Sequence, residues 1–357
     1  MSNAEWNTIS FPKLNLEFPV YSTAFTVFGI EIKWYGILIA IGVLLALIYC
    51  FRRMKSVGID GDRATDVVFF AFIGGILGAR SYYVIMQWDQ YKGDIKEIFA
   101  IRDGGLAIYG GLIGALLVGM LMCKIRKVKL LPLLDLASMG FLIGQAFGRW
   151  GNFFNHEAFG SNTTLPWGMT SPRIQSVLTK TASQIYETCG VTVDPSAPVH
   201  PCFLYESIWC LIGFILLHLY FKHRRFDGEI FLLYIGWYGL GRFFIEGLRT
   251  DSLMVGHIRI SQLVAAASVI ASIVVIIAKR MKIKTDGEYI FYKDTEESKK
   301  LLAEAEAKNA EDERKQAEKK AKRINKYSEL DPKDKLVDNE DEITENKTED
   351  DKDGKDN

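Results

Sequence analysis

Seven apolar stretches, each about as long as a lipid bilayer is thick, constrain this chain more than any other feature. A helix rises about 1.5 Å per residue, so roughly 20 apolar residues cross the hydrocarbon core. The stretches are Trp34–Phe51, Thr65–Met86, Gly104–Cys123, Leu131–Gly148, Phe203–Phe221, Ile230–Leu248 and Ile258–Ala278. The sequence therefore predicts an all-α polytopic integral membrane protein with about seven transmembrane helices.

Clusters of Lys and Arg follow every second stretch, after Phe51, Cys123, Phe221 and Ala278. Basic residues favour cytoplasmic loops, so these four ends are expected in the cytoplasm. The N-terminus is then outside and the C-terminus cytoplasmic. The loop from about 152 to 202 lies outside, and its length predicts a small folded cap rather than a bare linker.

Composition changes sharply along the chain, although Lys plus Arg equals Asp plus Glu overall. Residues 1–284 are predominantly apolar and predict a membrane-embedded domain. Residues 285–327 are rich in Lys, Glu and Ala, which indicates a charged cytoplasmic helix. Acidic residues dominate 328–357, which predicts a disordered tail. A solvated tail is favoured over an element that docks to a partner.

The five cysteines show no pairing motif or metal-ligand spacing. None is expected to act as a nucleophile, and nothing in the sequence indicates a metal or another cofactor. Cys189 and Cys202 both fall near the predicted outside loop, where an oxidising compartment would allow a disulfide. The sequence leaves that pairing open.

Small residues recur four positions apart within the apolar stretches. This spacing lets helix backbones approach closely inside a membrane, so it predicts a tightly packed bundle. The residues concerned are Gly74 and Gly78, Gly110 and Gly114, and then Gly140, Gly144 and Gly148.

Charged residues inside the apolar stretches indicate where the chemistry lies, because an unpaired charge at the bilayer centre costs about 2.5–3.5 kcal/mol or more. Asp66 and Asp135 fall near cytoplasmic ends and are interpreted as interfacial or helix-start carboxylates. Five others fall in the outer halves of four helices and predict a polar cavity near the outer leaflet; a structural salt-bridge network is the alternative. They are Arg80, Arg149, Glu206, Arg242 and Glu246.

The residues beside this cavity suggest a phospholipid ligand, since the planar fork of arginine donors suits phosphate. Asn152 and Asn155 could hydrogen-bond to glycerol hydroxyls. Glu157 could hold an arginine, act as an acid–base group or be an ordinary loop carboxylate. His156 and His200 are each a candidate proton acceptor, although a loop histidine more often has no such role.

The thirteen residues from Gly148 to Gly160 resemble a known signature, G-R-x-G-N-F-x-N-x-E-x-x-G, at every fixed position. This is the signature of bacterial prolipoprotein diacylglyceryl transferases. Other family motifs follow in the expected order, and the resemblance covers about residues 18 to 280. These motifs are Trp34-Tyr35-Gly36, Gly78-Ala79-Arg80, Tyr109-Gly110-Gly111, His200-Pro201 with Tyr205-Glu206, and Gly241-Arg242-Phe243-Phe244-Ile245-Glu246.

The resemblance implies a transferase of the bacterial cell membrane that carries out the first step of lipoprotein maturation. Such enzymes move the diacylglyceryl group of phosphatidylglycerol onto the lipobox cysteine thiol of a prolipoprotein signal peptide, with glycerol phosphate leaving. Membrane lipid and these signal peptides are then the expected partners, nucleic acid is not, and the nucleophile belongs to the substrate.

The resemblance also implies site residues. Arg149 would bind the phosphatidylglycerol headgroup, and Arg242 would assist the phosphate or gate the site. Positioned arginines of this kind would stabilise the leaving phosphate. The remaining residues implied for the site have less defined roles, and they are Tyr35, Arg80, Asn152, Glu157, Gly160, His200, Tyr238 and Glu246.

One position departs from the family pattern. Many members carry a histidine before the paired glycines of the third stretch, where it has been interpreted as the catalytic base; this chain has Tyr109. A phenol in water has a pKa of about 10, so tyrosine is a poor base near neutral pH unless that pKa is strongly lowered. Tyr109 stays a catalytic candidate, but it could instead orient the lipid by a hydrogen bond, with the proton removed elsewhere.

Two other classes of protein compete with a transferase. A transporter or lipid flippase would also gather charge in a bundle, but transporters often show paired halves with interrupted helices, and the sequence shows no such duplication. A receptor or scaffold acting through its soluble tail would leave the residues between Arg149 and Glu157 without a purpose. A transferase accounts for both features.

Overall fold

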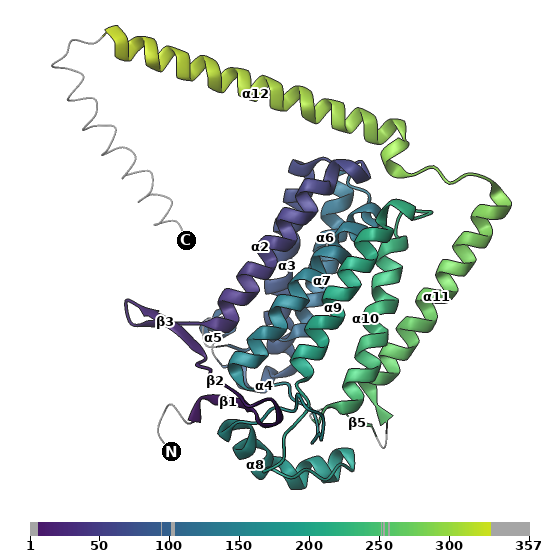
Figure 1. Ribbon diagram of the computed structural model, residues 1–357. Helices are drawn as coiled ribbons and strands as arrows, with labels where there is room; N and C mark the ends of the chain where they lie inside the picture. Colours follow the sequence, from purple (N-terminus) through teal and green to yellow (C-terminus); the bar gives the residue numbers. More distant parts are fainter. Residues whose placement is uncertain are drawn as a thin grey trace. The chain divides into compact units, whose positions relative to one another are not determined.

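The computed structural model describes residues 6–93, 95–100, 104–250, 252, 254–255 and 258–329. The chain divides into two compact units, Met1–Lys299 and Lys300–Asn357. The first unit contains a bundle of seven long helices (Figure 1). They are α2 (Trp34–Arg53), α3 (Gly61–Met86), α6 (Ile108–Arg126), α7 (Leu130–Asn155), α9 (Cys202–Tyr220), α10 (Glu229–Leu248) and α11 (Ile260–Asp286).

Shorter elements connect these helices. Three are α-helical: α4 (Trp88–Tyr91), α5 (Ile95–Phe99) and α8 (Pro172–Cys189). Single 3-10 turns are η1 (Pro12–Leu14), η2 (Met54–Val57), η4 (Phe221–His223) and η5 (Tyr292–Asp294). The described strands form three antiparallel hairpins, β1 (Thr8–Phe11) with β2 (Leu16–Pro19), β3 (Thr23–Val27) with β4 (Ile30–Lys33), and β5 (Met254–Val255) with β6 (Ile258–Arg259).

The predicted all-α multi-pass membrane fold is confirmed. Six of the described helices are long and apolar enough to cross a membrane, and they match six of the seven predicted stretches. The helix outside this set, α10, carries Arg242 and Glu246 yet packs on α7, α9 and α11. The count of seven and the orientation in the membrane stay predictions.

Helix boundaries differ from the predicted stretches at two places that matter for the site. Gly104 and Gly105 have φ angles of +91° and +74°, so α6 begins only at Ile108. A left-handed backbone suits glycine but cannot continue a right-handed helix. In the other direction, α7 runs on to Asn155, so the start of the signature is helical rather than part of the cap.

The predicted close packing of glycines is confirmed between α3 and α6. A Cβ atom added at Gly78 would lie 2.4 Å from the carbonyl oxygen of Gly110, and one at Gly114 would lie 2.2 Å from that of Gly74. The two backbones thus approach to a distance that only glycine allows. This contact joins α3 and α6 into a pair.

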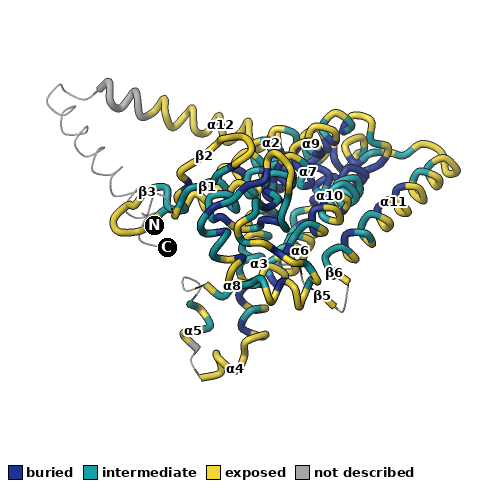
Figure 2. Tube along the Cα trace, turned by 60° about the horizontal axis from the view of Figure 1, so that its bottom comes forward, coloured by how far each residue is buried: buried dark blue, intermediate teal, exposed yellow. Residues whose placement is uncertain are grey.

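Helix α7 is the centre of a second group of helices, because α2, α9 and α10 all pack against it. Half of the residues in the most apolar part of α7 are buried, compared with 11% for the corresponding parts of α2, α6 and α11 (Figure 2). Leu136, Met139 and Leu142 of α7 are fully buried in this core. A residue placed on α7 is therefore held by neighbours on several sides.

The predicted cap is a small folded structure. It contains α8, whose buried residues Ile174, Leu178 and Ile185 pack in one apolar cluster with Ile9 of β1. The Ser171 hydroxyl caps α8 by accepting a hydrogen bond from the backbone N–H of Ile174 at 3.1 Å. No disulfide joins Cys189 and Cys202 in the structure.

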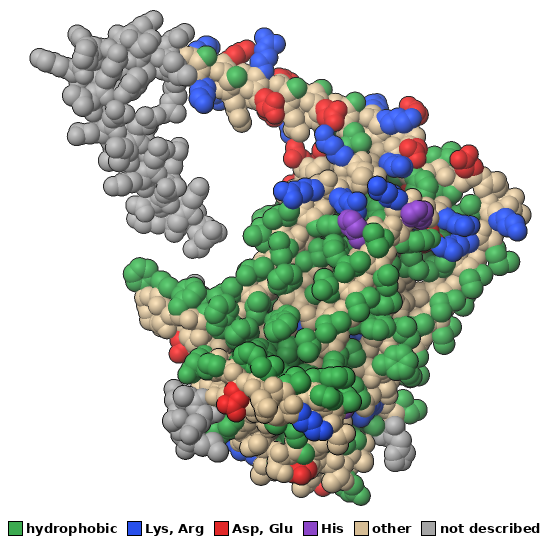
Figure 3. Space-filling model, viewed as in Figure 1, with side chains coloured by type: hydrophobic (Ala, Val, Ile, Leu, Met, Phe, Trp, Pro, Cys, Tyr) green, Lys and Arg blue, Asp and Glu red, His purple; other side chains and the backbone are tan. Residues whose placement is uncertain are grey.

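The four basic clusters lie at one end of the bundle, which we call the basic end (Figure 3). They are Arg52–Lys55, Lys124–Lys129, Lys222–Arg225 and Lys279–Lys282. The side chain of Glu229, at the start of α10, accepts a hydrogen bond of 2.8 Å from Nε of Arg280 on α11. The opposite end, where α7 and α10 finish near the cap, is called the cap end.

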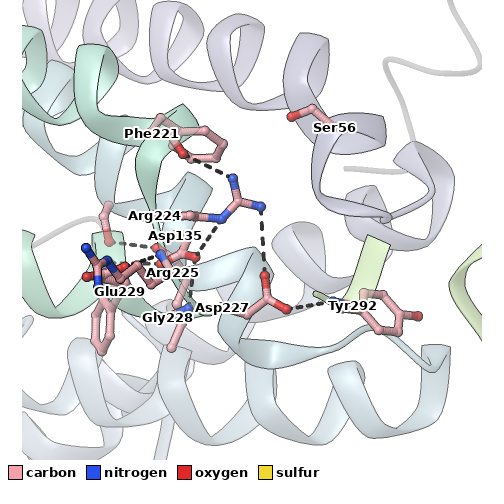
Figure 4. Close-up of polar contacts among 12 residues, drawn as sticks. Ser56, Asp135, Phe221, Arg224, Arg225, Asp227, Gly228, Glu229 and Tyr292 are labelled. Carbon is pink, nitrogen blue, oxygen red and sulfur yellow. Dashed lines mark hydrogen bonds and ion pairs between the residues drawn. The ribbon is translucent and has the colours of Figure 1, made fainter. Parts of the chain in front are cut away.

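Asp135 is completely buried and corrects the expectation of an interfacial carboxylate. Its Oδ2 accepts a hydrogen bond from the backbone N–H of Gly228 at 2.8 Å, and its Oδ1 one from Phe231 at 3.0 Å (Figure 4). Gly228 immediately precedes α10 and Phe231 lies in its first turn, and the helix has no capping side chain of its own. Asp135 therefore caps a neighbouring helix.

Asp66 is the other carboxylate expected near a cytoplasmic helix end. Its Oδ2 atom lies 2.6 Å from Nη2 of Arg126.

Part of the predicted charged segment forms α12 (Glu296–Glu329), whereas residues 285 and 286 belong to α11. Its described side chains from Glu304 on are almost all exposed, and pairs four residues apart support the helix, such as Arg314 with Glu318 at 3.1 Å. The predicted domain boundaries stay predictions, and residues 330–357 lie outside the described part of the chain.

Candidate functional site

Arg149 and Glu206 form the first contact of the site. Arg149 lies near the end of α7, and its Nη2 atom is 2.7 Å from Oε2 of Glu206 in the second turn of α9. The Glu206 side chain is 4% exposed, while that of Arg149 is 25% exposed. A buried carboxylate thus holds a guanidinium group that a ligand can still reach.

Two more arginines converge on the same carboxylate. Oε1 of Glu206 lies 3.1 Å from Nη1 of Arg242 and 3.6 Å from Nη1 of Arg249. Arg242 also pairs with Glu246, one turn further along α10, as their spacing predicts. Three guanidinium groups and two carboxylates leave one net positive charge, so this cluster favours an anionic ligand.

The cluster has the properties needed to bind a phosphate. Arg242 is 22% exposed and is fixed by carboxylates on both sides. A guanidinium group presents paired donors that match phosphate oxygens. Tyr238, one turn before Arg242, lies within electrostatic range of Arg149 and Arg242. Of the five intramembrane charges predicted to meet here, the contacts join Arg149, Glu206, Arg242 and Glu246.

The signature continues into a tight turn at the cap end of α7. The side-chain amides of Asn152 and Asn155 both donate to Oε1 of Glu157, each at 3.0 Å. His156 and Ala158 have φ angles of +57° and +55°, so the chain reverses sharply on both sides of Glu157. The two amides therefore position this exposed carboxylate, and their bonding to it was not foreseen from the sequence.

His156 is a structural residue rather than a proton acceptor. It is buried, its Nε2 lies 3.1 Å from the carbonyl oxygen of Val20, and its Nδ1 lies 3.0 Å from the hydroxyl of Ser171. A carbonyl only accepts, so Nε2 carries the proton and Nδ1 accepts from the hydroxyl. Burial, and to a lesser extent the charge of Arg173, lowers the pKa of His156 from its ordinary value of 6.5.

His200 belongs to a second hydrogen-bonded group at the cap end. The indole N–H of Trp167 donates to the Tyr205 hydroxyl at 2.7 Å, and that hydroxyl lies 3.1 Å from Nδ1 of His200. Burial lowers the pKa of His200 from 6.5. The Trp167 contact joins the cap to α9, one residue before Glu206.

Two implied site residues, Tyr35 and Gly160, take part in close packing with a neighbouring backbone. The ring of Tyr35 lies so close to Gly151 that an added Cβ there would be 2.3 Å from it. A Cβ at Gly160 would lie 2.8 Å from the carbonyl oxygen of Leu248, where the cap crosses the end of α10. Their roles in substrate binding stay predictions.

Arg80 is not joined to the cluster by any contact among the described residues. Its guanidinium donates to the backbone carbonyls of Glu97, Ile98, Gly104 and Gly105 at 2.5–3.0 Å. The Tyr91 ring lies 5.1 Å from the guanidinium carbon. Arg80 is buried and ties the α5 region to α3, and its role with substrate stays a prediction.

Tyr109 also lies apart from the arginines in the contacts that the structure describes. It is the second residue of α6 and is 73% exposed. Its hydroxyl makes no hydrogen bond to another described residue, so it is available to a ligand. Its catalytic role stays a prediction.

A pair of tryptophans beside the cluster was missed by the sequence analysis. The indole N–H of Trp209 donates to the carbonyl of Trp237 at 2.9 Å, and that of Trp237 donates to the carbonyl of Trp209 at 2.9 Å. The rings stack at 4.3 Å. We call this pair the tryptophan clasp. Its sequence signal is a glycine four residues after each tryptophan, at Gly213 and Gly241.

These observations define a class: a helical membrane protein with a net positive cluster of arginines and glutamates at one end of its bundle. Comparison with known proteins identifies the family. A model of the prolipoprotein diacylglyceryl transferase family matches residues 22–278. The chain belongs to this family.

Relatives named phosphatidylglycerol–prolipoprotein diacylglyceryl transferase cover the same region. The protein of Finegoldia magna is 43% identical over 265 residues, which is 74% of this chain and 98% of that protein. The protein of Clostridium novyi is 45% identical, over 73% of this chain and 97% of its own length. That of Staphylococcus haemolyticus is 41% identical, over 73% and 88%.

Proposed function

We propose that this chain transfers the diacylglyceryl group of phosphatidylglycerol to the lipobox cysteine of prolipoproteins in the bacterial cell membrane. The observation that carries the proposal is the cluster of Arg149, Glu206 and Arg242, with its excess positive charge inside a lipid-embedded bundle. Family membership supports the reaction, and the names of the relatives support both substrates.

The reaction breaks the bond between the glycerol carbon of the lipid and a phosphate oxygen. A carbon–sulfur bond forms to the substrate cysteine, glycerol phosphate leaves, and the thiol proton balances the charge that the phosphate gains. A thiolate is the attacking form, so a cationic surrounding favours the reaction. Charge that grows on the phosphate in the transition state is stabilised by donors already in place.

The chain's own residues would divide this work. Arg149 binds the phosphate, because the ion pair with Glu206 fixes the guanidinium group of Arg149 and leaves part of that side chain exposed. Arg242, held between two carboxylates, provides a second cation for the leaving group. Glu157, positioned by two asparagine amides, lies in the turn that follows α7 and is proposed to contact the glycerol headgroup.

The test is a transfer assay with purified protein, phosphatidylglycerol and a lipobox peptide followed by mass spectrometry. We expect the peptide to gain one diacylglyceryl group at its cysteine. Arg149→Ala should abolish this gain, while Lys180→Ala, which removes an exposed charge from α8, should not reduce it. No mass gain in conditions where a relative is active would refute the proposal, and normal turnover by Arg149→Ala would refute the role of Arg149.

A further inference from the structure

A groove on the surface of the bundle lies between α2 and α9, with α7 as its floor. Its volume is about 470 Å³, within the roughly 300–1,000 Å³ that small-molecule sites occupy. Leu45 and Ile48 of α2 form one wall, Leu211 of α9 the other, and Ile143 and Phe147 of α7 the floor. Leu45, Ile48 and Leu211 are exposed, so the groove opens toward the surrounding lipid.

The groove has a cationic end. Arg52 and Arg53 line it there, and no acidic residue does. Arg53 is held in place, because its Nη1 donates to the Tyr49 hydroxyl at 2.8 Å and its guanidinium lies 5.2 Å from the Phe221 ring. Arg52 is exposed and has no hydrogen bond or ion pair within the described part of the chain. Its donors are free for an anion.

Aromatic rings lie on all three helices toward the cap end. Trp34 of α2 stacks on Phe154 of α7 at 5.2 Å, and Trp150 of α7 contacts Phe203 of α9 at 5.6 Å. The first contact joins α2 to α7 and the second joins α7 to α9, near the cap end.

Helix α7 contributes to both the groove and the arginine cluster, with Leu142, Ile143, Ala146 and Phe147 lining the groove and Arg149 in the cluster. Ile143 and Phe147 face the groove, whereas Gln145 donates to the Tyr234 hydroxyl of α10 at 3.0 Å and Arg149 pairs with Glu206 of α9.

The two sites also lie at opposite depths. Arg52 and Arg53 are the last two residues of α2, whose 20 residues suffice to cross the hydrocarbon core. They therefore lie at headgroup depth at the basic end. Arg149 lies near the cap end of α7, which runs antiparallel to α2. Lipids with headgroups at these two places come from opposite leaflets.

We propose that the groove binds an anionic phospholipid from the leaflet at the basic end. One acyl chain lies along the apolar walls, and the phosphate is bound by Arg52 and Arg53. This lipid differs from the one that reacts at Arg149, because its headgroup is in the other leaflet. The proposal does not depend on the transferase activity, since it is carried by the groove and its charge alone.

The test uses the purified full chain, stripped of lipid in detergent, and phosphatidylglycerol with a photoreactive group on one acyl chain. Phosphatidylcholine with the same chains is the comparison lipid. Crosslinked peptides are located by mass spectrometry. We expect phosphatidylglycerol to label peptides containing Leu45–Arg53 and Leu211–Phe214, and phosphatidylcholine to label them much less.

Substitutions distinguish phospholipid binding in the groove from nonspecific attraction of an anionic lipid to the basic end. Arg52→Gln with Arg53→Gln should reduce labelling of both peptides about tenfold or more, because two charge-assisted contacts to phosphate are lost. Arg52→Gln alone, which breaks no described contact, should reduce labelling in the same direction. The matched control is Lys279→Gln with Lys284→Gln, which removes equal charge from the basic end of α11 and should leave labelling unchanged.

A third variant, Leu211→Trp, fills the groove and should reduce labelling by either lipid. The proposal is overturned if the two lipids label these peptides equally, if the arginine double variant matches the lysine control, or if labelling occurs only on other helices.

Discussion

At the scale of single residues, the arginine cluster acts as one unit because three guanidinium groups share the buried carboxylate of Glu206. Removing one partner would leave a buried charge uncompensated, which costs more than the pair contributes. The position of Arg149 therefore depends on residues of α9 and α10 as well as on its own helix. Substitutions of Tyr109 and of the two cap histidines, His156 and His200, test roles that these contacts do not assign.

Tyr109 should contribute through its hydroxyl, which is exposed and available to the lipid. We predict that Tyr109→Phe lowers kcat/KM of the transfer assay about tenfold, the effect of losing one hydrogen bond to a charged group. Tyr109→His should keep substantial activity, since the imidazole can also donate. Wild-type activity in the Phe variant would show that only the ring matters.

The cap should be destabilised by mild acid. Burial lowers the pKa of His156, so below about pH 6.5 the unfolded chain binds a proton that the folded chain does not. The contribution of neutral His156 to the free energy of unfolding is fully present above pH 6.5. It is lost as the pH falls, by up to about 1.4 kcal/mol per pH unit. Burial also lowers the pKa of His200, so His200 changes the stability in the same direction.

Thermal unfolding between pH 7.5 and 5.5 measures this effect. The Tm of the wild-type protein should fall more steeply with pH than that of His156→Gln, which lacks the His156 contribution. Parallel slopes would contradict the assignment of a buried neutral histidine.

At the scale of elements, the tryptophan clasp fixes how α9 and α10 lie against each other. Each indole occupies the space above a glycine on the partner helix, and it bonds to the partner's backbone. Trp209 is three residues from Glu206, and Trp237 is five from Arg242. The clasp therefore sets the register in which that carboxylate and that arginine meet.

Enlarging either glycine should disturb the site from outside it. A Cβ at Gly241 would lie 2.3 Å from Nε1 of Trp209, so we predict that Gly241→Ala costs about 1–3 kcal/mol and reduces transfer activity. Gly144→Ala is the control for stability, because an added Cβ there meets nothing within 4 Å. Equal Tm values for the two variants would show that α9 and α10 tolerate a shift.

At the scale of the whole molecule, the first unit extends past the family match, which ends at residue 278. The segment from Tyr289 to Ser298, which we call the strap, docks on the basic end. The backbone N–H of Tyr292 donates to Asp227 at 2.7 Å, and the Ser298 hydroxyl donates to the Gly58 carbonyl at 2.8 Å. Lys129 pairs with Glu297 at 3.1 Å.

The strap should stabilise the bundle, whereas the rest of the C-terminal region should not. We predict that a chain ending at Lys299 keeps the Tm of the full chain, and that one ending at Asp286 has a lower Tm because the strap contacts are lost. Thermal unfolding in detergent compares the three. A shorter chain as stable as the full one would show that the strap contacts add nothing.

The amino-acid sequence determined the membrane fold, the common end of the basic clusters, the packing glycines and the signature around Arg149. These features follow from local chemistry: apolar length, charge spacing and the size of side chains at four-residue intervals. The pairing of Arg242 with Glu246 was predictable for the same reason, since one turn of helix separates them.

Only the tertiary structure decided which helices bring partners to those residues. Glu206 as the shared acceptor, Asp135 as the cap of α10 and the clasp all join residues about 30 to 90 positions apart, and no local pattern specifies such contacts. For the same reason Arg80 was grouped with the cluster, although its donors bond to backbone carbonyls near α5. Residue type and depth in the membrane were readable from the sequence; the face of each helix that meets a neighbour was set by packing.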